Sequence, residues 1–100
     1  MNAQTKMLAK HRAIYERRQS LEDTEWLSSK RYTNQVSLSD RVLLQLAKAP
    51  CANDDEFFAK LAYIVEIELK DYGDPEGRDF ESTVSAVRSY LEQRKAAAAA

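Results

Sequence analysis

The sequence predicts an all-α fold, a small bundle of three to four helices that ends in an antiparallel helical hairpin. Only two glycines and two prolines occur in 100 residues, whereas the tight turns of β-sheet proteins use both residue types heavily. Residues that favour helices, such as alanine, leucine, glutamate and lysine, are abundant. Apolar residues also recur at helical spacing along most of the chain. We predict one domain over residues 1–95, followed by a low-complexity alanine tail over residues 96–100.

The first predicted helix runs from Ala3 to about Leu21. Its apolar residues Met7, Ile14 and Leu21 recur every seven positions, which places them on one side of a helix. Such a seam packs either inside the protein's own core or against a second copy. The sequence leaves the monomer and the homodimer open.

The second predicted helix ends near Lys48, but the sequence does not fix where it begins. Trp26 is one possible beginning. Helix propensity is weak over residues 33–39, so a kink or a loop there is an alternative. In that case Ser37 or Ser39 caps a shorter helix.

Two breaks delimit the last two predicted helices. Pro50 ends the preceding helix, and Asn53 with Glu56 has the spacing of a capping box. Gly73 and Pro75 then punctuate the chain before a final helix that reaches Arg94. Hydrophobic periodicity predicts which apolar sets of the two helices face each other: Phe57, Leu61, Ile64 and Val65 against Phe80, Val84, Val87 and Leu91.

Charge is distributed unevenly along the chain. Residues 1–50 carry nine Lys/Arg and five Asp/Glu, whereas residues 51–100 carry six and eleven, for a net charge of −1 overall. This asymmetry indicates either attraction between the two halves of the fold or a dipolar surface that favours antiparallel self-association or a charged partner. Contact with nucleic-acid phosphates is one hypothesis for the basic first helix, and solvated charge is the alternative. The candidate phosphate-contacting residues are Lys6, Lys10, Arg17 and Arg18.

Residues 41–67 have the rhythm of a helix-turn-helix, but their chemistry does not suit DNA. The second helix of that pair opens with Asp54, Asp55 and Glu56. A recognition helix presents its N-terminal residues to the major groove, where three carboxylates would repel phosphates. This segment is therefore not expected to read DNA.

The sequence shows no catalytic, cofactor or metal site. His11 is the only histidine and Cys51 the only cysteine, and nothing in their spacing indicates a nucleophilic pair. We interpret His11 as a packed or half-exposed helix residue and Cys51 as an inert small residue in a turn. The acidic residues around Gly73 do not have the ligand spacing of a calcium loop. We therefore expect a protein that is not an enzyme and that needs no cofactor.

A protein-interaction or accessory role is the leading hypothesis, with a small regulator or nucleic-acid-associated protein as the alternative. The aromatic content of the first half suggests a possible partner surface at Tyr15, Trp26 and Tyr32. No stretch approaches the roughly 20 apolar residues of a membrane span, so we expect no membrane partner. One cysteine and no secretory signal predict a cytoplasmic protein.

A segment that includes Pro50 resembles a recurring segment in uncharacterised small helical proteins of bacterial genomes, particularly of prophage or plasmid regions. The resemblance covers residues 44–52 and then Glu56, Lys60, Leu61 and Ile64. In those proteins a long helix ends at a Pro-Ala-type turn, and a Lys-Leu pair follows in the next helix. Here Pro50 is followed by Cys51, which departs from the pattern. The resemblance implies a helical hairpin and a bacterial or phage origin, and it brings no site residues.

Overall fold

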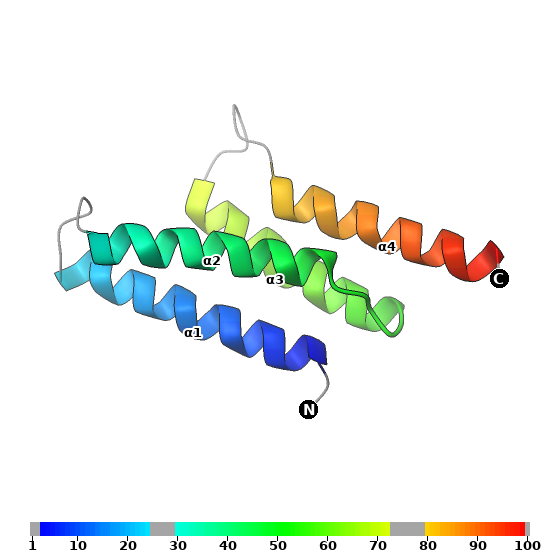
Figure 1. Ribbon diagram of the computed structural model, residues 1–100, viewed down its shortest axis with the longest axis horizontal. Helices are drawn as coiled ribbons and strands as arrows, with labels where there is room; N and C mark the ends of the chain where they lie inside the picture. The colour runs from blue at the N-terminus through cyan, green and yellow to red at the C-terminus, as the bar shows by residue number, and fades with distance from the viewer. Residues whose placement is uncertain (1–2, 25–29, 73–79, 100) are drawn as a thin grey trace. The chain divides into compact units, whose positions relative to one another are not determined.

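The computed structural model describes residues 3–24, 30–72 and 80–99, and these form four helices and no strand. Figure 1 shows the helices in chain order. The bounds are Ala3–Thr24 for α1, Lys30–Lys48 for α2, Asp54–Tyr72 for α3 and Glu81–Ala99 for α4. The predicted class, an all-α bundle with a C-terminal antiparallel hairpin, is confirmed.

The chain divides into two compact units, Met1–Leu43 and Leu44–Ala100. The division falls inside α2, so the last turn of α2 belongs to the second unit with α3 and α4. We describe each unit by itself. The expectation of one domain over residues 1–95 stays a prediction.

In the first unit, α1 and the first part of α2 run side by side in opposite directions (Figure 1). Arg18 links them, because its Nη1 donates a hydrogen bond of 3.4 Å to Oγ of Ser39. The guanidinium of Arg18 also lies 4.5 Å from the centre of the Tyr15 ring, a favourable cation–π arrangement. His11 is fully buried, and its ring stacks on that of Tyr15 with 5.9 Å between the centroids.

The second helix is continuous through residues 33–39, so no loop interrupts it. Ser39 is therefore not an N-cap. Its hydroxyl instead donates to the carbonyl of Val36 one turn earlier, at 3.1 Å, a bond that serine commonly makes inside helices. Ser39 is the buried residue of the described part of this segment, and its hydroxyl also accepts the bond from Arg18 of α1. Such a tertiary contact can override weak helix propensity.

The second unit begins at the end of α2, where the predicted break at Pro50 is confirmed by the end of the helix at Lys48. The predicted N-cap at Asn53 also forms, although the return bond from Glu56 reaches the residue before the cap and not Asn53 itself. Oδ1 of Asn53 accepts the backbone N–H of Glu56 at 2.8 Å, and the Glu56 carboxylate accepts the N–H of Ala52 at 3.3 Å. Two otherwise unpaired donors at the start of α3 are thereby satisfied.

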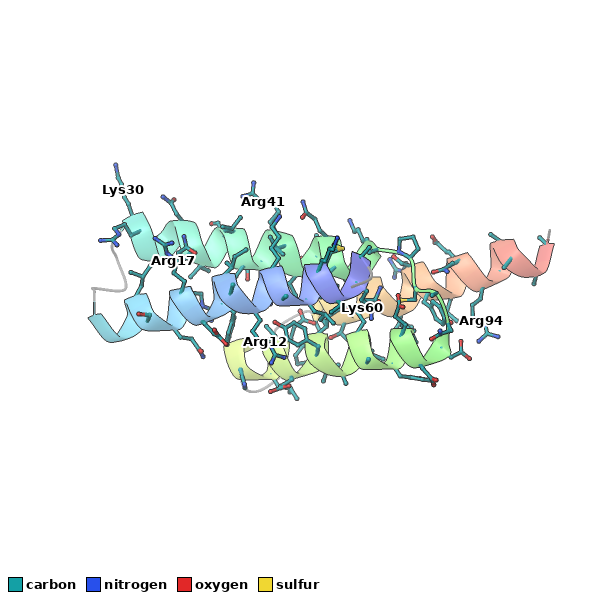
Figure 2. All side chains as sticks on the ribbon, turned by 90° about the horizontal axis from the view of Figure 1, so that it is seen from below. Arg12, Arg17, Lys30, Arg41, Lys60 and Arg94 are labelled. Atoms are coloured by element: carbon teal, nitrogen blue, oxygen red, sulfur yellow. The ribbon has the colours of Figure 1, made fainter. Side chains whose placement is uncertain are left out.

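A buried lysine closes the end of α2. Lys60, on α3 (Figure 2), is 1% exposed, and its Nζ donates to the carbonyls of Ala47 and Ala49 at 3.3 and 2.7 Å. The last carbonyls of a helix have no partner within the helix and carry the negative end of its dipole. An ammonium group satisfies both needs, which explains why a lysine is buried here.

The hairpin of α3 and α4 is antiparallel, because side chains near the start of α3 bond to the end of α4 and Glu68 bonds to its start. α4 begins at Glu81 rather than at Pro75, and Gly73 and Pro75 lie outside the described residues. At the other end α4 continues through the alanine tail to Ala99.

Candidate interaction surface

The side of α4 that contacts α3 is largely polar. The first of its polar contacts is a cap that α3 supplies to the start of α4. Glu68 is 3% exposed. Its carboxylate accepts the backbone N–H groups of Ser82 and Thr83 at 3.3 and 2.8 Å, and the Thr83 hydroxyl at 2.6 Å. These amides lie in the first turn of α4, where donors lack partners within the helix and the dipole favours negative charge. Glu68 therefore acts as an N-cap for a helix other than its own.

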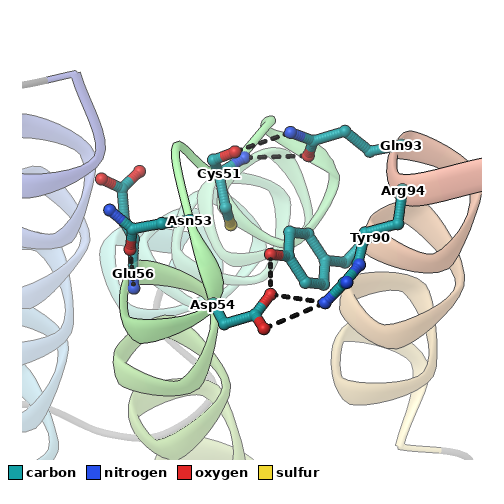
Figure 3. Close-up of polar contacts among 7 residues, drawn as sticks. All are labelled: Cys51, Asn53, Asp54, Glu56, Tyr90, Gln93 and Arg94. Carbon is teal, nitrogen blue, oxygen red and sulfur yellow. Dashed lines mark hydrogen bonds and ion pairs between the residues drawn. The ribbon is translucent and has the colours of Figure 1, made fainter. Parts of the chain in front are cut away.

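A second polar contact joins the start of α3 to the end of α4 (Figure 3). Asp54 accepts a hydrogen bond from the Tyr90 hydroxyl, and its two carboxylate oxygens lie 2.8 and 2.9 Å from Nη1 of Arg94. The bond from Tyr90, with a further contribution from Arg94, holds the pKa of Asp54 below its ordinary 3.8. The same bond raises the pKa of Tyr90 above its ordinary 10.0. The hydroxyl proton is thus held on Tyr90, and Asp54 stays charged.

The side-chain amide of Gln93 completes this end of the hairpin. Its Nε2 donates to the Cys51 carbonyl at 2.6 Å, and its Oε1 accepts the Cys51 N–H at 3.0 Å (Figure 3). Beside it, the rings of Phe57 and Tyr90 stack with 4.3 Å between centroids and an angle of 9°. Cys51, Phe57 and Tyr90 form a buried cluster against which Leu61 packs.

These contacts fix the rotation of α4 about its own axis. The residues that they hold inward share one side of the helix, and the buried residues of α4 are Ser82, Ala86 and Tyr90. The prediction that Val84, Val87 and Leu91 face α3 is therefore wrong. These three residues are 49%, 36% and 62% exposed, and we call them the α4 apolar stripe.

The apolar stripe forms an open groove on the outside of α4. Thr83 and Arg88 line it together with the three stripe residues, and its volume is about 370 Å³. The spacing of four, three and four from Phe80 through Val84 and Val87 to Leu91 is that of a helix prepared to pack against another helix.

An exposed phenylalanine on α3 adds to this apolar surface. Phe58 is 61% exposed and lies one turn after Asp54, while Leu91 lies one turn before Arg94. Asp54 and Arg94 are bonded to each other, so Phe58 and Leu91 each lie about one helical turn from the same ion pair. Exposed apolar side chains therefore occur on both helices of the hairpin.

The two side chains considered for nucleophilic chemistry are both buried. Cys51 is 3% exposed and His11 is fully buried, so neither side chain faces solvent. No cluster of histidine, cysteine and carboxylate side chains able to hold a metal ion occurs in the described part of the chain. The acidic residues around Gly73 lie outside it. None of the described helices combines the length and apolarity needed to cross a lipid bilayer.

Only part of the predicted aromatic surface falls within the residues that the structure describes. Tyr15 is 6% exposed, because Arg18 and His11 cover its ring. It is therefore a core residue of the first unit and not a member of an exposed patch. Trp26 and the side chain of Tyr32 lie outside the described residues, so their part in a partner surface stays a prediction.

Three of the four predicted phosphate-contacting residues lie on the surface. Lys6, Lys10 and Arg17 are exposed on α1 (Arg17 is labelled in Figure 2), and their spacing puts them on one face of the helix. Arg18 is 8% exposed and bonded to Ser39. Its guanidinium serves the interior of the first unit, which removes it from this set.

The spacing of apolar residues in the sequence identifies the outward-facing stripe, but it does not say whether the stripe faces α3 or the outside of the hairpin. Hydrophobic periodicity identified the stripe residues correctly and assigned them to the wrong side. The missed residues were Glu68, Tyr90 and Gln93, whose polar contacts determine that side. A glutamate in an otherwise apolar stripe of α3 was the available clue, because a buried carboxylate requires donors.

Comparison of this chain with family models, with curated proteins and with solved structures finds no match. The resemblance of residues 44–64 to small helical proteins of prophage and plasmid regions therefore remains an expectation.

Proposed function

We propose that this chain is a non-enzymatic protein-interaction module that binds apolar helical surfaces through the α4 apolar stripe. The observation that carries the proposal is the exposure of Val84, Val87 and Leu91 at helix-packing spacing. A cytoplasmic location and a bacterial or phage origin belong to this proposal.

The energetics of an exposed apolar face support it. Burying apolar surface contributes about 25 cal/mol per Å², so three aliphatic side chains and a neighbouring Phe58 left in water are a source of binding energy. Single exposed apolar residues are ordinary, whereas a contiguous set on one face marks an interaction site. Arg88 at the rim of the groove adds a charge by which partners can be selected.

Site-specific photo-crosslinking in living cells tests this function. A photoreactive amino acid is placed at Leu91, in the stripe, or at Ala59, which is exposed on α3 outside the stripe. We expect adducts between position 91 and another polypeptide, lost when Val87→Asp is added, and none from position 59. No adduct from position 91, or equal adducts from both positions, would contradict the function.

A second candidate function is sequence-independent contact with nucleic-acid phosphates through α1. It is favoured by the exposure of Lys6, Lys10 and Arg17 on one face of α1. Each cation that neutralises a phosphate steepens the salt dependence of binding by about one unit of log K per unit of log salt. Duplex binding that weakens in this way and is reduced by Lys10→Ala, but unchanged by Arg18→Lys, would favour it. No duplex binding at low salt would remove it.

A further inference from the structure

We infer that the partner of the α4 apolar stripe is a second copy of this chain, docked with the two α4 helices antiparallel. The inference rests on the proposed function and names its partner. It is drawn from the order of the charged residues beside the stripe. When one copy is reversed, an acidic residue of each copy faces a basic residue of the other.

The stripe has the heptad spacing of a helix–helix seam. Phe80, which immediately precedes α4 and is half-buried, and the three stripe residues occupy successive core positions of such a seam. In an antiparallel pair, the residue numbers of facing positions add up to a constant. Placing Val84 opposite Val87 of the second copy therefore places Phe80 opposite Leu91. All four core positions then meet apolar residues, and the contact is symmetric, as a two-fold dimer requires.

The charges follow one edge of the same seam. Glu81, Arg88 and Lys95 are seven residues apart and exposed, so they lie in line beside the stripe and read acidic, basic, basic. In an antiparallel pair these edges face each other. In the register given above, Glu81 then lies between Arg88 and Lys95 of the second copy, nearer Arg88, and the contact occurs twice.

A parallel pair would not use these charges. In a parallel pair this edge of one helix faces the opposite edge of the other. That opposite edge carries Thr83, Tyr90 and Ala97 and no charge. Of these, Tyr90 is already bonded to Asp54. Electrostatic complementarity therefore selects the antiparallel arrangement.

The decisive experiment reverses the sign of one of these charges at a time, in two separate variants of the chain. Molar mass is measured by light scattering over a range of protein concentrations. We expect the wild type to form a dimer. We expect Glu81→Lys and Arg88→Glu each to raise its dissociation constant about tenfold or more, because each places like charges together twice. Helical content measured by circular dichroism should stay the same in both variants.

Mixing the two variants should restore dimerisation, because Lys at position 81 of one copy then meets Glu at position 88 of the other. Glu66→Lys, a charge reversal at an exposed position of α3, serves as the control and should leave the dissociation constant within about twofold. A mixture that stays as weak as its components would overturn the antiparallel register.

A wild-type chain that is monomeric up to roughly 1 mM would overturn the homodimer altogether. The proposed interaction function would survive that result if position 91 cross-links to a different polypeptide. It would fail if position 91 cross-links to no polypeptide, or to no greater extent than position 59 does, so the two failures are distinguishable.

Discussion

The two helices of the C-terminal hairpin use their side chains in opposite ways. α3 buries apolar residues such as Ile64 together with two charged ones, Lys60 and Glu68, whereas α4 buries small and polar residues and exposes its aliphatic stripe. The difference shows that apolar periodicity locates a face of a helix without saying what that face meets. Caps and hydrogen bonds supplied by a neighbour decide the rotation of α4.

The sharpest test of this comparison uses two adjacent phenylalanines. Phe57 is 8% exposed and stacks on Tyr90, whereas Phe58 is 61% exposed. We expect Phe57→Ala to lower the free energy of unfolding by about 3–5 kcal/mol, the range for truncating a buried phenylalanine. Phe58→Ala should cost about 1 kcal/mol or less. Chemical denaturation at low protein concentration measures both, and equal losses would show that the hairpin packs otherwise.

The carboxylate cap on α4 comes next in expected size. Glu68→Ala leaves amides at the start of α4 without their acceptor and should cost about 1–3 kcal/mol of unfolding free energy. The matched change is Glu66→Ala, which removes only an exposed ion pair with Lys70. That variant should lie within about 0.5 kcal/mol of the wild type. If the two glutamates behave alike, Glu68 does not cap α4.

A smaller effect is expected from the contact between Asp54 and Tyr90, and it depends on pH. Because the pKa of Asp54 is lowered in the folded state, this contact stabilises the fold above the ordinary pKa of 3.8. The stabilisation is lost as the pH falls through the folded-state value. The raised pKa of Tyr90 gives the alkaline counterpart, with stability lost as the pH rises through that value.

Titration of the Asp54 carboxyl by NMR measures the acid limb. In Tyr90→Phe its pKa should move up toward 3.8, since the hydroxyl donor is the largest cause of the shift. Tyr63→Phe, which removes a hydroxyl from another buried tyrosine, should leave the Asp54 pKa where it is. A pKa of Asp54 that does not respond to Tyr90→Phe would exclude the hydrogen bond in solution.

The smallest effect is expected on the stripe itself. Val84 is 49% exposed, so Val84→Ala should change the unfolding free energy of the monomer by about 0.5 kcal/mol or less. Measured where the dimer is populated, the same change should cost more, because the side chain is then buried twice. A loss of 1 kcal/mol or more in the monomer would place Val84 in the core, as hydrophobic periodicity had indicated.

Much of the fold could be predicted from local signals. Pro50 and the pair Asn53–Glu56 act within a few residues of themselves, so the end of α2 and the cap of α3 were both predictable. Hydrophobic periodicity also identified α1 and α3. The continuity of α2 could not be predicted from helix propensity, which is weak over residues 33–39, because the contact of Ser39 with Arg18 joins residues that are distant in the sequence.

The candidate surface was harder to predict for a related reason. The rotation of α4 depends on partners that are distant in sequence, such as Glu68 for Thr83 and Asp54 for Tyr90. No spacing rule reports such contacts. The burial of Tyr15 under Arg18 is of the same kind, which is why an aromatic residue was read as a possible surface.

The two buried charges of α3 also have a consequence for the direction of the chain. Lys60 meets the negative pole of α2, and Glu68 meets the positive pole of α4. If α2 ran the other way, the buried Lys60 would meet the positive end of its dipole. If α4 ran the other way, the buried Glu68 would meet the negative end. The apolar contacts of a helical bundle discriminate weakly between such reversed arrangements. In this hairpin, two side chains eight positions apart specify which end of each neighbouring helix belongs where.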